Sequence, residues 1–335
     1  MFDLSKICRI LKKVTSLNKF ISTLIKGAIS LGLIALFFYQ VDWQDILATA
    51  KTAQAAYLAL AVLMFVLSNF LGAIQWHALL QLQKIDLPFK QVLALYFVGV
   101  FFNNFMVGNV GGDAVRIYDL KRLTGRGISG FAATFLDRFI GLFVLSSFSV
   151  IAFAFSPQLW QSALVLPILS LGGGLCAVLC FGFSGRLSDL VVQLCHRLLP
   201  SKVAGFVSDI RDCFQIYRRA YAVLVRVGLL ACGVQLSRVG VYFTVGLALG
   251  QSVAFVHYLT FIPLIAIVAA VPISFGGIGV RENMGALLFG QVGMAAPVAL
   301  TLMFFGYLTG IVASLMGGIM FVLRKTSHPH REEAS

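Results

Sequence analysis

Two polar stretches interrupt this apolar chain: GNVGGDAVRIYDLKR, residues 108–122, and ISFGGIGVREN, residues 273–283. Aligned on their glycine pairs, both stretches follow the pattern Gly-Gly-x-x-Val-Arg, and the arginines of the two copies are Arg116 and Arg281. The copies lie almost half the chain apart. A polar phrase that returns at this distance in an apolar chain predicts two related halves.

The composition gives the class of protein. Of the 335 residues, 59% are hydrophobic and 12% are charged. Several apolar runs are about 20 residues long, the length of a helix that crosses a hydrocarbon core of roughly 30 Å. The predicted fold class is therefore all-α, that of a polytopic integral membrane protein. No long polar stretch remains that could form a separate soluble domain.

Apolar segments recur along the whole chain. They cover residues 21–40, 55–78, 90–107, 128–155, 161–183, 222–249, 257–275 and 296–323. We interpret 90–107 and 257–275, each of which ends at a glycine motif, as re-entrant segments, which leaves about six full spans. The N-terminus is basic over residues 1–26, and the apolar run after it lacks the cleavage pattern of a signal peptide, so we interpret that run as a retained span.

The basic residues support the re-entrant interpretation and give an orientation. Most of the 26 Lys and Arg residues then face one side, in the N-terminus, near Lys84 and Lys90, and in 116–126, 186–226 and the tail 324–335. The outer loops keep only Lys51 and Arg281. This asymmetry is the positive-inside pattern, which predicts cytoplasmic termini and a place in the cytoplasmic (inner) membrane.

The same arrangement makes the two halves an inverted repeat. The first span of the half 55–155 runs inward, and that of the half 222–323 runs outward, within one membrane domain, residues 27–323. Between the halves, residues 184–221 carry apolar side chains every three to four positions among charges. This periodicity predicts amphipathic helices that lie in the membrane interface.

The glycine motifs supply the candidate binding residues. Glycine permits the non-helical backbone of a re-entrant turn. Successive backbone amides at a helix terminus can donate hydrogen bonds to a phosphate, and the guanidinium of each arginine adds a pair of donors. The candidate substrate-binding residues are Gly111, Gly112, Asp113, Arg116, Ser274, Gly276, Gly277, Gly279, Arg281 and Glu282. Helix packing alone also favours glycine pairs in membranes, so a purely structural role is the alternative for either motif.

Three further charges, Asp137, Arg138 and Arg238, lie within predicted spans. A charge at the bilayer centre costs at least ~2.5 kcal/mol on insertion scales, so each should face protein or water and have a partner. Neighbours on a helix are about 100° apart, so Asp137 and Arg138 need not pair with each other. The sequence supports a packing role and a transport role equally. Glu282 either neutralises Arg281 or meets an amine or a proton.

With these motifs the chain resembles the flippase-type membrane domain of the lysylphosphatidylglycerol synthases and related stand-alone membrane proteins. The resemblance rests on the phrase 108–122 and on a Pro-x-Ser-x-Gly-Gly-x-Gly-x-x-Glu form that ends at Glu282, and it covers about residues 20–325. It implies translocation of a lipid, aminoacylated in the synthases and polyprenyl-linked or hopanoid-type in other members. It marks Glu282 as the family's usual acid and Asp113 as the acid after the first glycine pair.

Enzymatic chemistry finds little support, and we expect no catalytic residue, no metal and no cofactor. The five His do not combine with acids or cysteines at metal-ligand spacing, and no nucleotide-binding or nucleophile motif occurs. The six Cys lie in spans or on the cytoplasmic side, which predicts no disulfide. The net charge of +13 is spread along one membrane face, which argues against a nucleic-acid partner.

We therefore expect a lipid flippase or scramblase that moves a phosphate-bearing lipid, a phospholipid or a polyprenyl-linked lipid, through a central site between the two motifs. Two alternatives stay open. The protein is a non-transporting membrane partner that presents lipid to a lipid-modifying enzyme, or a small-solute transporter of the same architecture. The sequence sets neither the lipid, nor the direction of transport, nor the oligomeric state.

Overall fold

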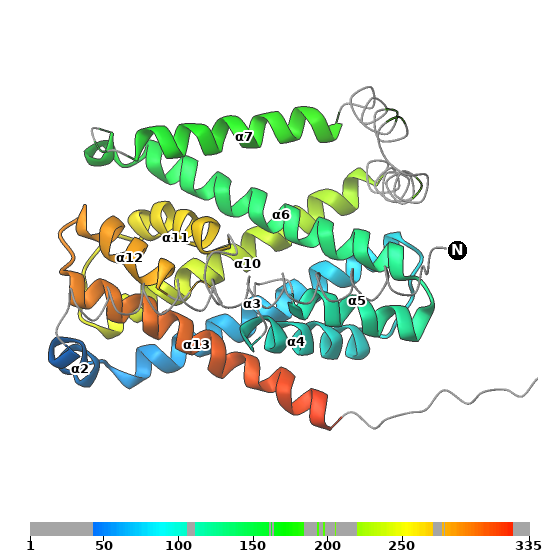
Figure 1. The fold of residues 1–335 in the computed structure, drawn as a ribbon, viewed down its shortest axis with the longest axis horizontal. Helices are drawn as coiled ribbons and strands as arrows, with labels where there is room; N and C mark the ends of the chain where they lie inside the picture. The colour runs from blue at the N-terminus through cyan, green and yellow to red at the C-terminus, as the bar shows by residue number, and fades with distance from the viewer. Residues whose placement is uncertain are drawn as a thin grey trace, which may run out of the picture.

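A computed structural model of the chain describes residues 43–105, 111–160, 164–183, 220–270 and 279–323, with a few single residues between them. This described part consists of α-helices and one short 3-10 helix, with no strand (Figure 1). The all-α fold class is confirmed. Predictions for residues 1–26, the span 21–40, most of 184–221 and the tail 324–335 lie outside the described residues.

Four described helices are long and apolar enough to cross a membrane. They are α3, Ala55–Leu82; α6, Gly127–Ala154; α10, Tyr221–Ala248; and α13, Ala296–Val322. They match four predicted spans closely, except that α3 continues beyond residue 78. His77 and Gln81 end its apolar run but not its backbone hydrogen bonding. The chain is thus a multi-pass membrane protein.

The other helices are shorter. They are α2, Trp43–Lys51; α4, Phe89–Phe105; α5, Gly111–Thr124; the 3-10 helix η1, Pro157–Leu159; α7, Val165–Phe183; α11, Phe255–Ala270; and α12, Val280–Gly290. The segments predicted to be re-entrant form α4 and α11, of 17 and 16 residues. Both fall short of the roughly 20 residues of a full span.

Each short apolar helix forms a hairpin with the helix that follows it. α4 packs against α5, and α11 packs against α12. In Figure 1 the first hairpin lies in the right half of the bundle and the second in the left half. Glycine allows the close approach in the first hairpin, because a Cβ on Gly112 would overlap the carbonyl oxygen of Gly99.

The helix packing follows the predicted inverted repeat. α3 and α10 run antiparallel: the amide of Gln54 donates to the carbonyl of Ala248 at 2.9 Å, and Met64 meets Gly240 further along. Contacts in one half recur in the other. α4 packs on α13 in the way that α11 packs on α6, and α5 packs on α6 in the way that α12 packs on α13. The contact of α6 with α10 likewise corresponds to that of α13 with α3.

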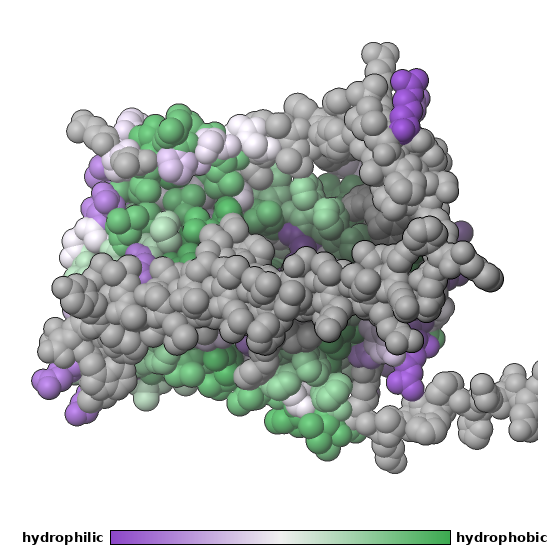
Figure 2. All heavy atoms as spheres, viewed as in Figure 1, coloured by the Kyte–Doolittle hydropathy of each residue, from purple (hydrophilic) through white to green (hydrophobic). Residues whose placement is uncertain are grey.

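The surface divides into an apolar middle and two hydrophilic ends (Figure 2). The described bases at one end of the bundle lie in or beside the turns α3–α4 and α5–α6, which meet where Arg126 donates to the carbonyl of Lys84 at 3.0 Å; they are Lys84, Lys90, Lys121, Arg122 and Arg126. At the other end the described loops and α2 carry one base, Lys51. The prediction that Arg281 belongs to an outer loop is wrong, because α12 begins inside the bundle and Arg281 is half-buried in its first turn.

Candidate functional site

A cavity of about 260 Å³ lies between the two halves and is lined by residues of both. Its polar lining consists of Asn69, Tyr96, Asn103, Asn104, Asp113, Arg116, Arg138, Gln235, Arg238, Tyr242, Arg281 and Tyr307. These side chains come from helices that are otherwise apolar. Polar residues at such positions mark functional sites in membrane proteins.

Four arginines line the cavity, one each from α5, α6, α10 and α12. They are Arg116, Arg138, Arg238 and Arg281, and Asp113 is the one carboxylate among the described lining residues. The cavity is therefore positively charged. An anionic ligand with several acceptor oxygens suits it best, because guanidinium groups bind carboxylates and phosphates through paired hydrogen bonds.

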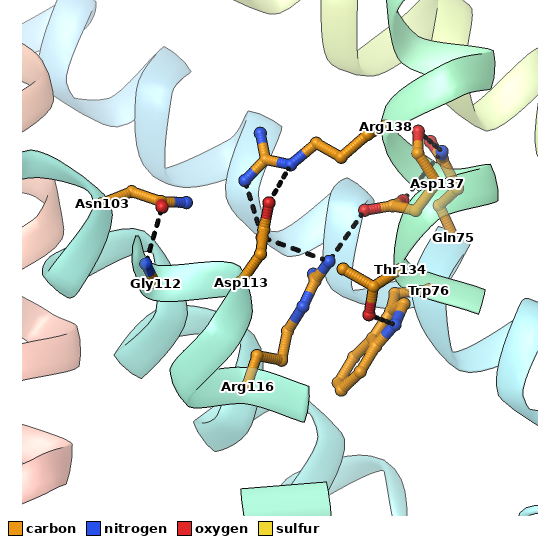
Figure 3. Close-up of polar contacts among 9 residues, drawn as sticks. All are labelled: Gln75, Trp76, Asn103, Gly112, Asp113, Arg116, Thr134, Asp137 and Arg138. Atoms are coloured by element: carbon orange, nitrogen blue, oxygen red, sulfur yellow. Dashed lines mark hydrogen bonds and ion pairs between the residues drawn. The ribbon is translucent and has the colours of Figure 1, made fainter. Parts of the chain in front are cut away.

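Arg116 is held rigidly from several sides. Its Nη2 lies 3.3 Å from Asp137 Oδ2 and 3.5 Å from Asp113 Oδ1. Its guanidinium also lies 4.3 Å from the ring centre of Trp76 (Figure 3) and 5.0 Å from that of Tyr96. The residue is 2% exposed. Carboxylates and aromatic faces together fix this arginine as part of the helix packing.

Arg138 has a different environment. Its Nε and Nη2 donate to the two carboxylate oxygens of Asp113 at 2.8 and 2.9 Å, a bidentate pair (Figure 3). Asp137, its neighbour in sequence, accepts instead from Gln75 Nε2 at 2.9 Å and from Arg116. The prediction that Asp137 and Arg138 need not pair with each other is confirmed.

In the second half, the acid of the motif has a structural contact. Glu282 Oε2 accepts from the amide of Gly279 at 2.6 Å and so caps the start of α12. Gly279 has a φ of 82°, which favours glycine. Arg281 stacks over the ring of Tyr307, with 4.7 Å from guanidinium carbon to ring centre. Glu282 is buried, and it is Arg281 that lines the cavity.

One glycine amide in each motif has a side-chain partner within the chain. The amide of Gly112 donates to Asn103 Oδ1 at 2.8 Å, as that of Gly279 donates to Glu282. Both helix starts are thus capped by the protein's own side chains. The donors left to face the cavity come mainly from arginines and asparagines.

Several buried polar atoms at the cavity have no hydrogen-bond partner in the described structure. They are both side-chain polar atoms of Asn69, the Nδ2 of Asn104, and the Nε atoms of Arg116 and Arg238. All four residues line the cavity. Buried polar groups are almost always hydrogen-bonded, so their donors indicate a ligand rich in acceptors.

The structure gathers part of the predicted site. Asp113, Arg116, Arg138, Arg238 and Arg281 line the cavity. Gly111, Gly112, Asp137, Gly277, Gly279 and Glu282 lie in the surrounding helices and turns without lining it, and Ser274 and Gly276 lie outside the described residues. Sequence reasoning missed the lining residues Asn69, Asn104, Gln235, Tyr96, Tyr242 and Tyr307. The signal was present as polar residues within apolar runs, such as FFNNF.

Spanning helices in two inverted halves around a cavity lined by four arginines define a polytopic membrane protein with an internal cationic cavity. The chain belongs to the family described as the lysylphosphatidylglycerol synthase TM region, whose match covers residues 23–317. The family predicted from the two glycine motifs is therefore confirmed.

The chain is also similar to two archaeal proteins described as UPF0104 membrane proteins. It is 24% identical over 310 residues to one from Pyrococcus horikoshii, an alignment that covers 83% of this chain and 91% of that protein. It is 23% identical over 314 residues to one from Methanothermobacter thermautotrophicus, covering 86% and 88%. Each alignment spans most of both chains, as expected of a stand-alone membrane protein of this family.

Proposed function

We propose that this protein is a flippase or scramblase that moves a phosphate-bearing lipid across the inner membrane, with the head group passing through the central cavity. The observation that carries the proposal is the set of four arginines on one cavity between the two halves. Charges at membrane depth are costly without a counterion. A phosphate supplies that counterion and matches the forked geometry of guanidinium.

The hairpins suggest how one site could serve both sides of the membrane. As re-entrant elements, α4–α5 would enter from the cytoplasmic side and α11–α12 from the outer side, bringing Arg116 and Arg281 to the same cavity. Two pseudo-equivalent halves around one site near the midplane suit alternating access, because each half can open in turn. Both termini would then be cytoplasmic, as the distribution of bases favours.

The family match supports a lipid as the cargo, because the family's description names a region of lysylphosphatidylglycerol synthases. A cavity of about 260 Å³ is small for a whole lipid. The head group would therefore occupy it while the acyl chains stay in the bilayer. Since transport of this kind needs no bond to be made or broken, the proposal assigns no catalytic residue and no cofactor.

Arg281→Ala tests the proposal directly. The purified protein is reconstituted into liposomes that carry a fluorescent phospholipid, and movement between leaflets is followed by quenching the outer leaflet. We expect the wild type to accelerate movement and Arg281→Ala to slow it roughly tenfold or more, because a hydrogen bond to a charged group is worth about 1.5–3 kcal/mol. Arg281→Lys should recover only part of the rate, since lysine lacks the fork.

The matched control is Arg226→Ala, which removes an exposed arginine of α10 that does not line the cavity. It should transport like the wild type. A wild type that retains bound lipid but moves none would favour the non-transporting partner of a lipid-modifying enzyme. Uptake of a water-soluble anion without lipid movement would favour a small-solute transporter. Normal transport by Arg281→Ala would place the head-group site elsewhere.

A further inference from the structure

The side chains of Arg138 and Arg116, which both lie beside Asp113, differ in how much of their surface is exposed. The side chain of Arg138 is 44% exposed, although it lies in α6, one of the helices that can cross the membrane. The side chain of Arg116, which shares Asp113 with it, is 3% exposed. An arginine exposed within a span is costly unless it meets water or an anion. The exposure of Arg138 therefore requires an explanation.

The face of α6 around Arg138 is otherwise apolar and open. Phe135 precedes it by one turn and Leu142 follows it by one turn, so both lie on the same side of the helix. They are 50% and 49% exposed. Figure 2 shows hydrophilic atoms in a hollow near the middle of the green band.

The same arginine also lines the central cavity, together with its partner Asp113. Arg138 thus lines the internal cationic cavity, and on its own helix it lies between the exposed apolar residues Phe135 and Leu142. Such a place would suit a side chain at the mouth of a lateral opening of the cavity.

The hydrogen bonds of Arg138 leave one of its nitrogens available to donate to a ligand. Asp113 engages Nε and Nη2, and Nη1 has no hydrogen-bond partner among the described residues. The carboxylate holds the guanidinium plane in one orientation, so little side-chain freedom is lost when an anion binds. A phosphate oxygen can bind at Nη1 while the pair with Asp113 stays intact.

We propose that the cavity opens sideways at α6 and that Arg138 is the first group of the protein to bind the phosphate of an incoming lipid. This inference rests on the proposed function and names the path by which the head group reaches the site. The acyl chains lie against Phe135 and Leu142 while the phosphate pairs with Arg138. A lipid fits this surface better than a free anion does, because the groups flanking the arginine are apolar and exposed.

Site-specific photocrosslinking tests the opening independently of transport. A benzophenone amino acid replaces Leu142, and the protein is irradiated in liposomes of phosphatidylglycerol and phosphatidylcholine. We expect crosslinks to phosphatidylglycerol well above its share of the lipid, and a loss of roughly tenfold in that enrichment when Arg138→Ala is added. The control position is Leu229, an exposed residue of α10, where enrichment should be absent.

Transport supplies the second readout. Arg138→Ala should raise several-fold the fraction of anionic lipid needed for half-maximal rate, while Arg226→Ala leaves it unchanged. Arg138→Lys keeps a positive charge beside Asp113 and should fall between wild type and Arg138→Ala. The thermal unfolding temperature of each variant is measured in detergent, so that loss of folding is recognised.

The outcomes separate the two proposals. One outcome is that the wild type transports lipid and that both Arg138 variants fold and equal the wild type in crosslinking and in lipid dependence. The lateral opening at Arg138 is then wrong, and the proposed function stands. If the wild type transports nothing but crosslinking at Leu142 depends on Arg138, the opening stands and the transport function is wrong. Crosslinking at Leu142 that shows no preference for phosphatidylglycerol overturns the inference.

Discussion

At the scale of single residues, Arg116 and Arg281 occupy equivalent positions in the two sequence motifs but have different surroundings. Arg116 is enclosed by carboxylates and aromatic rings, whereas Arg281 is half-buried against Tyr307. The difference comes from the neighbouring spans. α6 supplies Asp137 and Arg138 to the first half, and its counterpart α13 carries no charged residue. The first half therefore contains an ion-pair network built on two charged residues of α6 that α13 does not have.

This network predicts that Arg116 supports the fold as well as the site. Arg116→Ala should destabilise the protein by roughly 3–5 kcal/mol, because it leaves the carboxylate of Asp137 buried without its cation. Adding Asp137→Asn should recover much of the loss, since the amide keeps the hydrogen-bonding shape without the charge. Thermal unfolding in detergent measures both variants. An unchanged unfolding temperature for Arg116→Ala would show that the network contributes nothing to stability.

At the scale of elements, the hairpins depend on how closely their helices approach. In the first hairpin the backbones of α4 and α5 meet at Gly99 and Gly112. The second hairpin has its own close contact, where a Cβ on Gly277 would lie 3.0 Å from the Cβ of Ala269. Small residues let membrane helices pack backbone to backbone, where dispersion contacts replace the hydrophobic effect. The glycines of the motifs therefore shape the hairpins.

Gly112→Ala tests this packing role. The added methyl group would overlap the carbonyl oxygen of Gly99 and the backbone nitrogen of Asn103, so the hairpin must shift. We expect this shift to lower the free energy of unfolding by roughly 1–3 kcal/mol. We expect a lower unfolding temperature and slower lipid transport, because Asp113 and Arg116 move with α5. The matched control is Gly173→Ala in α7, where an added methyl group has open space within 4 Å. Equal stability of the two variants would refute the close packing.

At the scale of the whole molecule, two inverted halves pack through α3 and α10 and enclose one cavity. Six described bases lie at the end of the bundle where α5 finishes and α10 begins: Lys84, Lys90, Lys121, Arg122, Arg126 and Arg226. Lys121 is exposed at that end, and Ser252 is exposed at the other, in the loop between α10 and α11. Charge distribution and inverted packing are independent features, and both predict that these two residues lie on opposite sides of the membrane.

Single cysteines at these positions test the topology. In a variant without its native cysteines, Lys121→Cys should react with a membrane-impermeant maleimide only after the cells are opened, and Ser252→Cys should react in intact cells. The expected pattern follows from the cytoplasmic position of the basic end. Retained lipid transport in each variant serves as the control for native insertion. Labelling of both cysteines from one side would exclude the proposed orientation.

The amino-acid sequence alone predicts the class, the four spans that the structure describes, the inverted packing of the two halves and the family. Each of these follows from local patterns: apolar runs of membrane length, the asymmetry of basic residues, and the repeated Gly-Gly-x-x-Val-Arg phrase. It also identified five charged residues that line the cavity, because charges inside apolar segments are conspicuous.

Which of these charges pair and which stay accessible became clear only from the packing of the helices. Asp113 pairs most closely with Arg138 of the next helix, Asp137 with Arg116, and Glu282 with the amide of its own helix start. Such partners depend on the rotation and register of packed helices, which sequence spacing does not fix. The same packing makes Arg116 a buried support and leaves Arg138 partly exposed at the edge of the cavity.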